Sequence, residues 1–129
     1  FLVRHREDLG QMCELVDPLD RALRSTRVLV RQTAVAAYHR RPVPKAYVLL
    51  AHDLADATDA VAEELAANRM ATAAQPVLLA IAEATGRVDR SDVLAAEAIL
   101  AQLRSVVVDL LMVAGMDQME STDALPPPR

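Results

Sequence analysis

The chain has few of the residues from which binding and catalytic sites are usually built. Among its 129 residues, three are glycine, one is cysteine and none is tryptophan, and aromatic residues make up 2%. Phe1, Tyr38 and Tyr47 are too sparse to form the stacking platforms on which proteins bind nucleic-acid bases. The chain also has no Gly-rich phosphate loop. We therefore expect no nucleic-acid partner.

The single cysteine and the three histidines exclude further kinds of site. Cys13 has no partner for an internal disulfide, and its apolar neighbours predict a small buried side chain. His5, His39 and His52 are scattered, without the spacing of a zinc site. No GxSxG elbow or other nucleophile–base set accompanies them. We expect no metal, no cofactor and no enzymatic activity.

The composition that remains is typical of helices. Hydrophobic residues make up 53% of the chain, most of them Ala, Leu and Val, and this favours helix over strand. A chain of this length can bury about two-thirds of its unfolded surface, so it needs no metal or disulfide. No stretch reaches the roughly 20 apolar residues that cross a bilayer. We predict an all-α fold, an up-down antiparallel bundle of about four helices.

The predicted helical domain covers residues 1–120, and residues 121–129 form a flexible tail. Three consecutive prolines near the end of the chain are typical of a mobile, extended segment. The sequence begins at Phe1 rather than at a methionine and has no signal peptide. We therefore interpret it as a piece of a longer protein.

The first predicted helix runs from Leu2 to Arg40 and contains a proline. Pro18 removes a backbone hydrogen bond and clashes with the preceding turn, so it predicts a kink or short break near Val16 and Asp17. If the helix restarts there, Asp17 is its N-cap. The residues expected to face the core recur with a helical period: Leu9, Met12, Cys13, Val16, Leu19, Leu23, Thr26, Val30, Thr33, Ala34 and Ala37.

Two more helices are predicted after a proline-containing linker. The second covers residues 44–68, and the third begins at residue 71 or 76 and ends at Thr85, with Gly86 in the left-handed position beyond it. The buried stripe of the second helix comprises Tyr47, Leu50, Leu54, Ala57, Val61 and Leu65. Its other face carries Asp53, Asp56, Asp59, Glu63 and Glu64. A solvated face is favoured over a cation site here, because no second carboxylate-bearing helix accompanies it.

The fourth predicted helix covers residues 92–114, with Ser91 or Asp89 as its cap and Gly115 at its end. Its buried stripe comprises Ala96, Ile99, Leu100, Leu103, Val106, Val107, Leu110 and Ala114. Val108 and Met112 lie off this stripe, so the last turns are apolar nearly all round. Such a helix is either deeply buried or paired with something. We predict weak self-association through it, with a homo-oligomer as the result.

The charges of the chain are divided unequally along its length. Residues 1–45 carry nine Lys or Arg against five Asp or Glu, whereas residues 46–129 carry five against thirteen. The usual meaning of a charge-rich helix is a solvated face, and we favour that interpretation. The alternative is that the basic part faces an anionic membrane surface.

Asp109 stands in the middle of an apolar run and needs a partner or contact with water. An arginine stays charged and offers a planar fork of donors that suits a partly buried carboxylate. We predict a structural ion pair between Asp109 and Arg27 of the first helix, with Arg24 as the second choice. Arg27 is preferred because it lies between Leu23 and Val30, at the edge of the predicted apolar stripe.

Two segments together resemble a known family of membrane proteins. Residues 19–31, LDRALRSTRVLVR, and residues 102–117, QLRSVVVDLLMVAGMD, are similar to the C-terminal region of the fusaric acid resistance (FUSC) family, whose members resemble aromatic acid exporters. Ser25 stands where an asparagine is common in that family. The resemblance implies a multi-helix membrane domain upstream of Phe1 and a location at the cytoplasmic face of the bacterial cell membrane. The basic first part would agree with the positive-inside rule.

Three functions follow from these observations. The first is a cytoplasmic helical domain of a FUSC-like exporter, which serves assembly or regulation and whose partner is the membrane domain of the same polypeptide. The second is a free-standing helical adaptor or small-ligand-binding bundle. The third, and weakest, is a carboxylate-rich metal or enzyme bundle. The coding sequence upstream of Phe1 separates the first two, and metal analysis separates the third.

Overall fold

The computed structural model describes residues 2–128, and statements about side chains below concern residues 6, 9, 10 and 12–128. It contains five α-helices and one 3-10 turn: α1 (Leu2–Tyr38), α2 (Lys45–Ala66), η1 (Ala71–Ala74), α3 (Gln75–Thr85), α4 (Leu94–Val113) and α5 (Gln118–Asp123). No strand occurs in residues 2–128. The all-α prediction is confirmed, with a fifth, short helix that the sequence patterns did not indicate.

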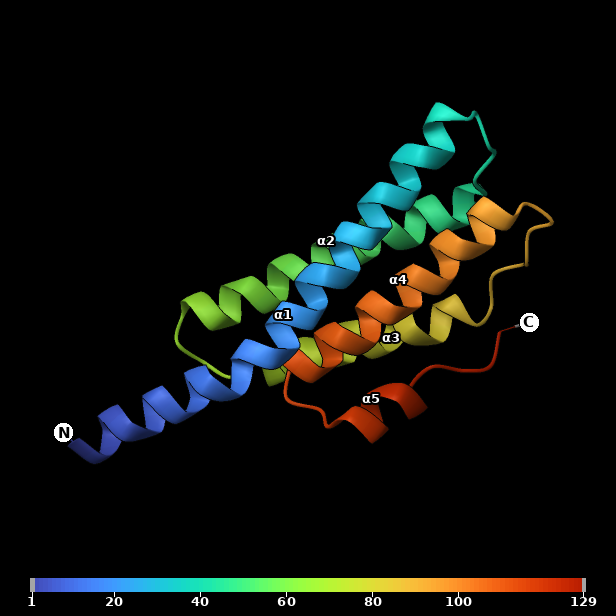
Figure 1. The fold of residues 1–129 in the computed structure, drawn as a ribbon. Helices are drawn as coiled ribbons and strands as arrows, with labels where there is room; N and C mark the ends of the chain where they lie inside the picture. Colours follow the sequence, from blue (N-terminus) through green and yellow to red (C-terminus); the bar gives the residue numbers. More distant parts are fainter. Residues whose placement is uncertain (1, 129) are drawn as a thin grey trace.

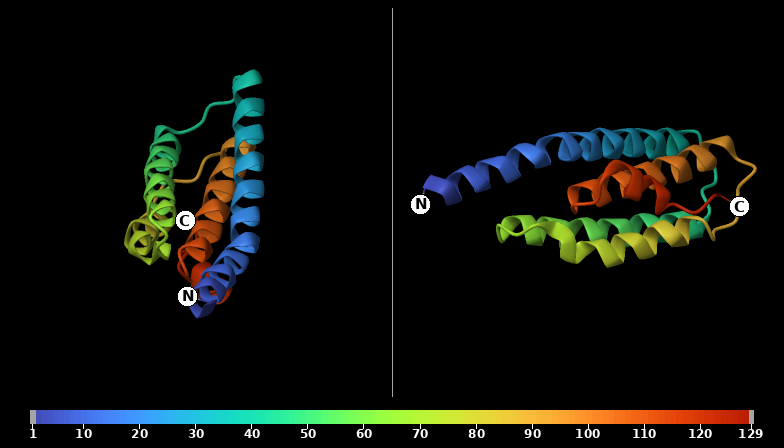
Figure 2. Two further views of the ribbon diagram at one scale, coloured as in Figure 1. Left: turned by 90° about the vertical axis from the view of Figure 1, so that its left-hand side faces the viewer. Right: turned by 90° about the horizontal axis from the view of Figure 1, so that it is seen from below.

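The four long helices alternate in direction, as predicted for an up-down bundle (Figure 1). Helix α4 is central, because it packs on α1, α2, α3 and α5. Helix α1 lies alongside α4 rather than on α2, and α2 and α3 form a second layer on the other side of α4 (Figure 2). The apolar surface of the last turns of α4 is thus largely covered within the chain: Leu111 and Val113 are fully buried, and Val108 and Met112 are half-buried. Our reason for expecting self-association through this helix no longer applies.

Helix α1 continues through Pro18 without a break. The predicted kink is present as a bend, since the N-terminal part of α1 runs at an angle to the rest and projects beyond the bundle (Figure 1). Asp17 is therefore an ordinary helical residue and not an N-cap, which corrects our alternative for this position. The helix ends at Tyr38, and Arg40 follows it with a positive φ of 52°.

The side of α1 that faces the bundle is not the predicted one. We call the row of residues that faces the bundle the inner stripe. It consists of the buried or half-buried residues Leu15, Pro18, Ala22, Ser25, Leu29, Gln32 and Ala36. Most of the predicted stripe is instead exposed, and we call this second row the outer stripe: Leu9, Met12, Val16, Leu19, Leu23, Thr26, Val30, Thr33 and Ala37. Cys13, expected to be buried, is exposed as well.

The error has a physical cause. Both stripes alternate steps of three and four residues, and they lie about 100° apart around the helix because they are offset by one residue. Periodicity alone cannot choose between two such rows. The inner stripe contains Ala22, Ser25 and Ala36, whose small side chains let α1 approach α4 closely, whereas the outer stripe is bulkier.

The predicted core faces of α2 and α4 are confirmed. In α2 the residues Tyr47, Leu50, Leu54, Ala57 and Val61 are buried, and Leu65 is half-buried. Every residue of the predicted α4 stripe is buried as well. Helix α2 carries one dominant apolar row, so its periodicity identifies the inward side. In α4 the buried surface is wider than predicted, because Leu111 and Val113 are fully buried as well.

Gly115 and Gly86 lie in turns that require glycine for different reasons. Gly115 has a φ of +102°, which a residue with a side chain adopts only with strain, and it ends α4 as predicted. Gly86 does not take the predicted left-handed conformation, since its φ is −84°. A Cβ at this position would overlap the ring of Pro126. Glycine is needed there because the tail passes close by.

The segment expected to be a free tail packs on the bundle over most of its length. Helix α5 begins at Gln118, with Asp117 as its N-cap, whose Oδ1 accepts a hydrogen bond from the backbone N–H of Glu120 at 2.8 Å. Ser121 is fully buried, and Leu125 and Pro126 are half-buried. The predicted boundary at residue 120 therefore falls inside a helix.

Candidate functional site

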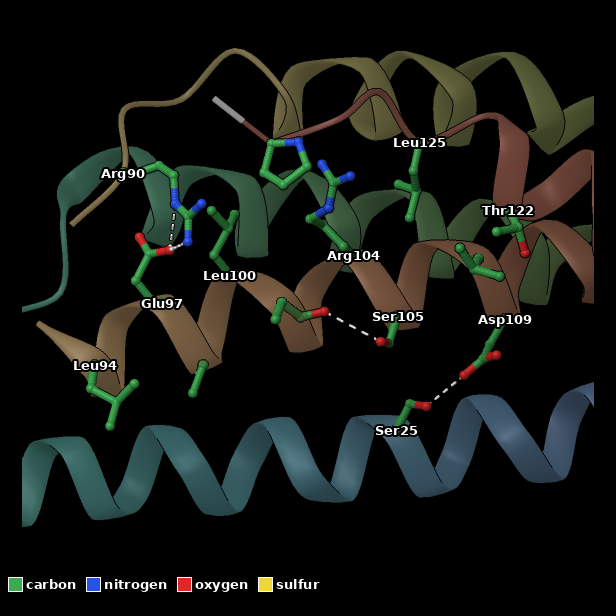
Figure 3. A pocket seen from close by; sticks show the side chains of 14 residues that line it. Ser25, Arg90, Leu94, Glu97, Leu100, Arg104, Ser105, Asp109, Thr122 and Leu125 are labelled. Atoms are coloured by element: carbon green, nitrogen blue, oxygen red, sulfur yellow. Dashed lines mark hydrogen bonds and ion pairs between the residues drawn. The ribbon is translucent and has the colours of Figure 1, made fainter. Parts of the chain in front are cut away.

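The predicted ion pair at Asp109 is not formed. Asp109 is half-buried on α4 and faces α1, where Ser25 Oγ donates a hydrogen bond to its Oδ2 at 2.5 Å (Figure 3). Arg27 is exposed and makes no ion pair in the described part of the chain. Arg24 binds Asp20 of its own helix instead, with Nη2 2.9 Å from Oδ2.

The geometry of α1 explains this correction. Ser25 belongs to the inner stripe, and successive helical residues turn by about 100°, so Arg24 and Arg27 point away from α4. The choice of Arg27 depended on its position beside Leu23 and Val30, and both of these residues are exposed.

Ser25 is contacted from two sides by α4. While its hydroxyl donates to Asp109, its main-chain carbonyl accepts a hydrogen bond from Gln102 Nε2 at 2.8 Å. Gln102 and Asp109 lie seven residues apart, two helical turns, and therefore share one face of α4. We call Ser25, Gln102 and Asp109 the α1–α4 junction. It fixes the register of α4 against α1 through directional hydrogen bonds rather than through an ion pair.

The junction lies at one end of a cavity of about 760 Å³ between α1, α4 and the C-terminal segment (Figure 3). The charged groups in its wall are bonded to other protein groups. Arg90 Nη2 lies 2.7 Å from Glu97 Oε2, and Asp109 accepts from Ser25. Arg104 Nη1 donates to Thr85 Oγ1 at 2.9 Å. These contacts stabilise the walls of the cavity.

Arg104 holds the tail against the bundle. Its Nη2 donates to the main-chain carbonyl of Pro126, and Figure 3 shows its side chain directed away from α1 and toward the tail. Thr85, which receives the other bond, is buried and itself donates to the carbonyl of Ala82 at 2.7 Å. Burial lowers the pKa of the Arg104 guanidinium. Sequence reasoning missed this contact because backbone carbonyl partners leave no side-chain pattern.

A second polar cluster closes the opposite end of α4. The side chain of Tyr47 is 1% exposed, and its hydroxyl donates to the carbonyl of Asp89 at 2.8 Å and lies 3.2 Å from Glu97 Oε1. The same Oε1 accepts from the backbone N–H of Ser91 at 2.6 Å. We call Tyr47, Asp89, Arg90, Ser91 and Glu97 the Tyr47–Glu97 cluster.

The cluster shifts the protonation of two of its members. The backbone N–H of Ser91, together with Arg90 and Tyr47, lowers the pKa of Glu97, although burial opposes the shift. Burial and the nearby Glu97 carboxylate raise the pKa of Tyr47. Neither Ser91 nor Asp89 is the N-cap of α4, which is Val93 and has no side-chain cap. A tyrosine in an apolar stripe does require a partner for its hydroxyl, and this was the signal available in the sequence.

The acidic face of α2 is exposed, as expected, at Asp53, Asp56, Asp59 and Glu63. Glu64 is half-buried and binds Arg69, with Oε2 2.7 Å from Nε, and this bond lowers the pKa of the carboxyl. Across the described side chains, no three His, Cys, Asp or Glu residues lie close enough to hold a metal ion together.

Two cavities lie between α1 and the second layer formed by α2 and the segment after it. One cavity of about 530 Å³ is lined by Val30 and Thr33 of the outer stripe and by Val48 of α2. Another, of about 410 Å³, is lined by Met12 and Val16 of the same stripe together with Leu65, Asn68, Arg69 and Met70, at and beyond the end of α2. We call these two cavities the α1–α2 groove. On the α1 side, the outer stripe lines both cavities together with Leu29 and Leu15 of the inner stripe.

The fold and these contacts define a class: an all-α bundle with polar junctions inside and an exposed apolar row on its longest helix. Comparisons with protein-family models, with curated proteins and with solved structures found no match for the chain. In the part of the chain that the structure describes, no helix has both the length and the hydropathy needed to cross a bilayer.

Proposed function

We propose that this chain is a cytoplasmic helical domain of a membrane exporter similar to the fusaric acid resistance family, and that it serves assembly or regulation rather than catalysis. One observation carries the proposal. The two segments that resemble the family, residues 19–31 and 102–117, lie far apart in the sequence and yet meet at the α1–α4 junction. Ser25, Gln102 and Asp109 thus have a shared structural reason to occur together.

The charges of α1 support the proposed location. Arg21, Arg27 and Arg31 are exposed and, unlike Arg24, make no ion pair in the described part of the chain. They can therefore face anionic lipid headgroups, where each cation contributes about 1 kcal/mol. The same surface agrees with the positive-inside rule for the part of a membrane protein that stays in the cytoplasm.

A role in assembly rather than catalysis is supported by how the polar groups are used. The charged groups that line the cavity of about 760 Å³ are bonded to neighbouring residues, whereas the outer stripe of α1 is mostly apolar and exposed. Apolar rows of this kind mark surfaces that bind another protein or a membrane. The outer stripe is also what favours the second candidate, a free-standing helical adaptor.

The test uses the native reading frame that contains this sequence. We expect it to encode transmembrane helices upstream of Phe1, and we expect the native-length protein to sediment with bacterial membranes. A protease added to inside-out vesicles should cleave this domain, while intact spheroplasts should protect it. A reading frame without such helices, together with a protein that stays in the supernatant, would reject the exporter and leave the adaptor.

A further inference from the structure

The outer stripe of α1 has the pattern of a second helix-packing surface. It alternates steps of three and four residues from Leu9 to Ala37, which is four heptads, and a heptad pattern of that length is typical of a coiled coil. Its large members are well exposed, from 43% at Leu19 to 64% at Met12. The inner stripe already packs α1 on α4, so α1 has two apolar faces and the bundle covers one of them.

Two charged residues beside the outer stripe are arranged so that the helix complements a reversed copy of itself. Asp20 precedes the middle of the stripe and Arg27 follows it, and both are exposed. At about 100° per residue, both lie along the same edge of the stripe. In an antiparallel pair centred between Leu23 and Arg24, Asp20 lies near Arg27 of the other copy, whereas a parallel pair places like charges together.

We propose that two copies of this chain pair through the outer stripe, with their α1 helices antiparallel and each occupying the α1–α2 groove of the other. The contact is isologous, because one surface meets the same surface of the second copy about a two-fold axis. The apolar row excludes water along the middle, and the opposite charges at its edge select the antiparallel direction. This inference rests on the proposed role in assembly and names the partner.

The direction of the pair can be tested with the native cysteine. Cys13 is exposed and lies beside the outer stripe, and in the antiparallel pair it lies near the exposed Ala34 of the other copy. The variant Ala34→Cys should form disulfide-linked dimers under mild oxidation. Within one chain the two positions are about 30 Å apart along a helix, so they cannot react with each other. The unchanged chain, and the variant Ala55→Cys on the exposed side of α2, should form few such dimers.

The surface itself is tested with a matched pair of substitutions. Leu23 and Val35 are both 51% exposed, but Val35 lies on the opposite side of α1 from the outer stripe. Analytical ultracentrifugation of the 129-residue chain should show a reversible dimer. Leu23→Glu should weaken it by about tenfold or more, because each copy loses a buried leucine side chain, and Val35→Glu should leave it unchanged.

Three results would overturn the proposal. One is a monomer at every concentration measured, and another is a dimer that Leu23→Glu does not weaken. The third is a monomer that binds phosphatidylglycerol vesicles and loses that binding in Leu23→Glu, which would assign the stripe to a membrane surface. Membrane sedimentation of the native-length protein is an independent measurement, so the exporter proposal can stand when the dimer fails.

Discussion

At the scale of single residues, the contact between α1 and α4 depends on side chains that do not carry opposite charges. Ser25 donates to Asp109, and Gln102 donates to the carbonyl of Ser25. A hydroxyl next to a half-buried carboxylate gives a charge-assisted hydrogen bond, which is stronger than a neutral one. Asp109 is therefore accommodated by a neutral partner, and the arginines of α1 stay in water.

A pair of double-mutant cycles distinguishes this contact from the predicted ion pair. We expect Ser25→Ala and Asp109→Ala each to destabilise the chain, by about 1–3 kcal/mol, with a coupling free energy of about 1 kcal/mol. Arg27→Met, at an exposed position, should change stability by less than about 0.5 kcal/mol and should add independently to Asp109→Ala. Urea unfolding of the six chains measures all of these. A measured coupling free energy between Arg27 and Asp109 would instead support the predicted ion pair.

Two glutamines on facing helices should respond in opposite directions to the same substitution. Gln32 Oε1 is buried and has no hydrogen-bond partner, so Gln32→Met removes an unsatisfied polar atom and should stabilise the chain by about 1 kcal/mol. Gln102 makes the bond to Ser25, so Gln102→Met should destabilise it by a similar amount. Thermal unfolding of both variants measures the direction of each change in stability. A loss of stability in Gln32→Met would contradict this prediction.

At the scale of whole elements, the sequence predicts a helix well when the helix has one apolar row. The buried residues of α2, and those of α4 except Leu111 and Val113, follow directly from the predicted stripes. The inner side of α1 does not, because two rows of equal period lie side by side and the choice between them depends on how closely α1 approaches α4. The prediction that Arg27 binds Asp109 depends on the outer stripe being the inward side of α1. The error about which side of the helix faces inward therefore also produced the wrong ion pair.

The C-terminal segment shows a different limit of sequence reasoning. Its prolines predict an extended, mobile chain, but its attachment depends on a hydrogen bond between Arg104 and the carbonyl of Pro126 and on the space that Gly86 leaves for the Pro126 ring. Neither contact follows from the composition of the segment, because both come from distant residues.

Whether Gly86→Ala stabilises or destabilises the chain should depend on whether the tail is present. In the full chain the new Cβ would meet Pro126, so we expect a loss of stability and faster hydrogen exchange in α5. In a chain that ends at Ala124 the obstacle is gone. There the φ of −84° suits alanine, and the substitution should stabilise by about 0.4–1 kcal/mol. Destabilisation in both backgrounds would mean that the tail is not the cause.

At the scale of the whole molecule, α4 organises the fold, because each of the other four α-helices packs on it directly. Its start is held by the Tyr47–Glu97 cluster and its middle by the α1–α4 junction. The sequence predicts which side of α4 faces inward but not these polar contacts, since Tyr47 and Glu97 lie 50 residues apart and nothing in either local pattern indicates the other. Glu97 therefore connects the stability of the entire bundle to pH.

The acid limb of the stability curve should contain a contribution from Glu97. In the folded chain the pKa of Glu97 lies below its ordinary value of 4.5, so the unfolded state takes up a proton first as the pH falls. The stabilisation is complete above pH 4.5 and is lost progressively below it, through the folded pKa. Glu97→Gln should be less stable than the unchanged chain at pH 7, and the difference should shrink as the pH falls.

Glu63→Gln, at an exposed position on α2, serves as the control and should show no such change. Urea unfolding from pH 7 to pH 3 measures both differences, and a constant difference for Glu97→Gln would exclude Glu97 as the group responsible.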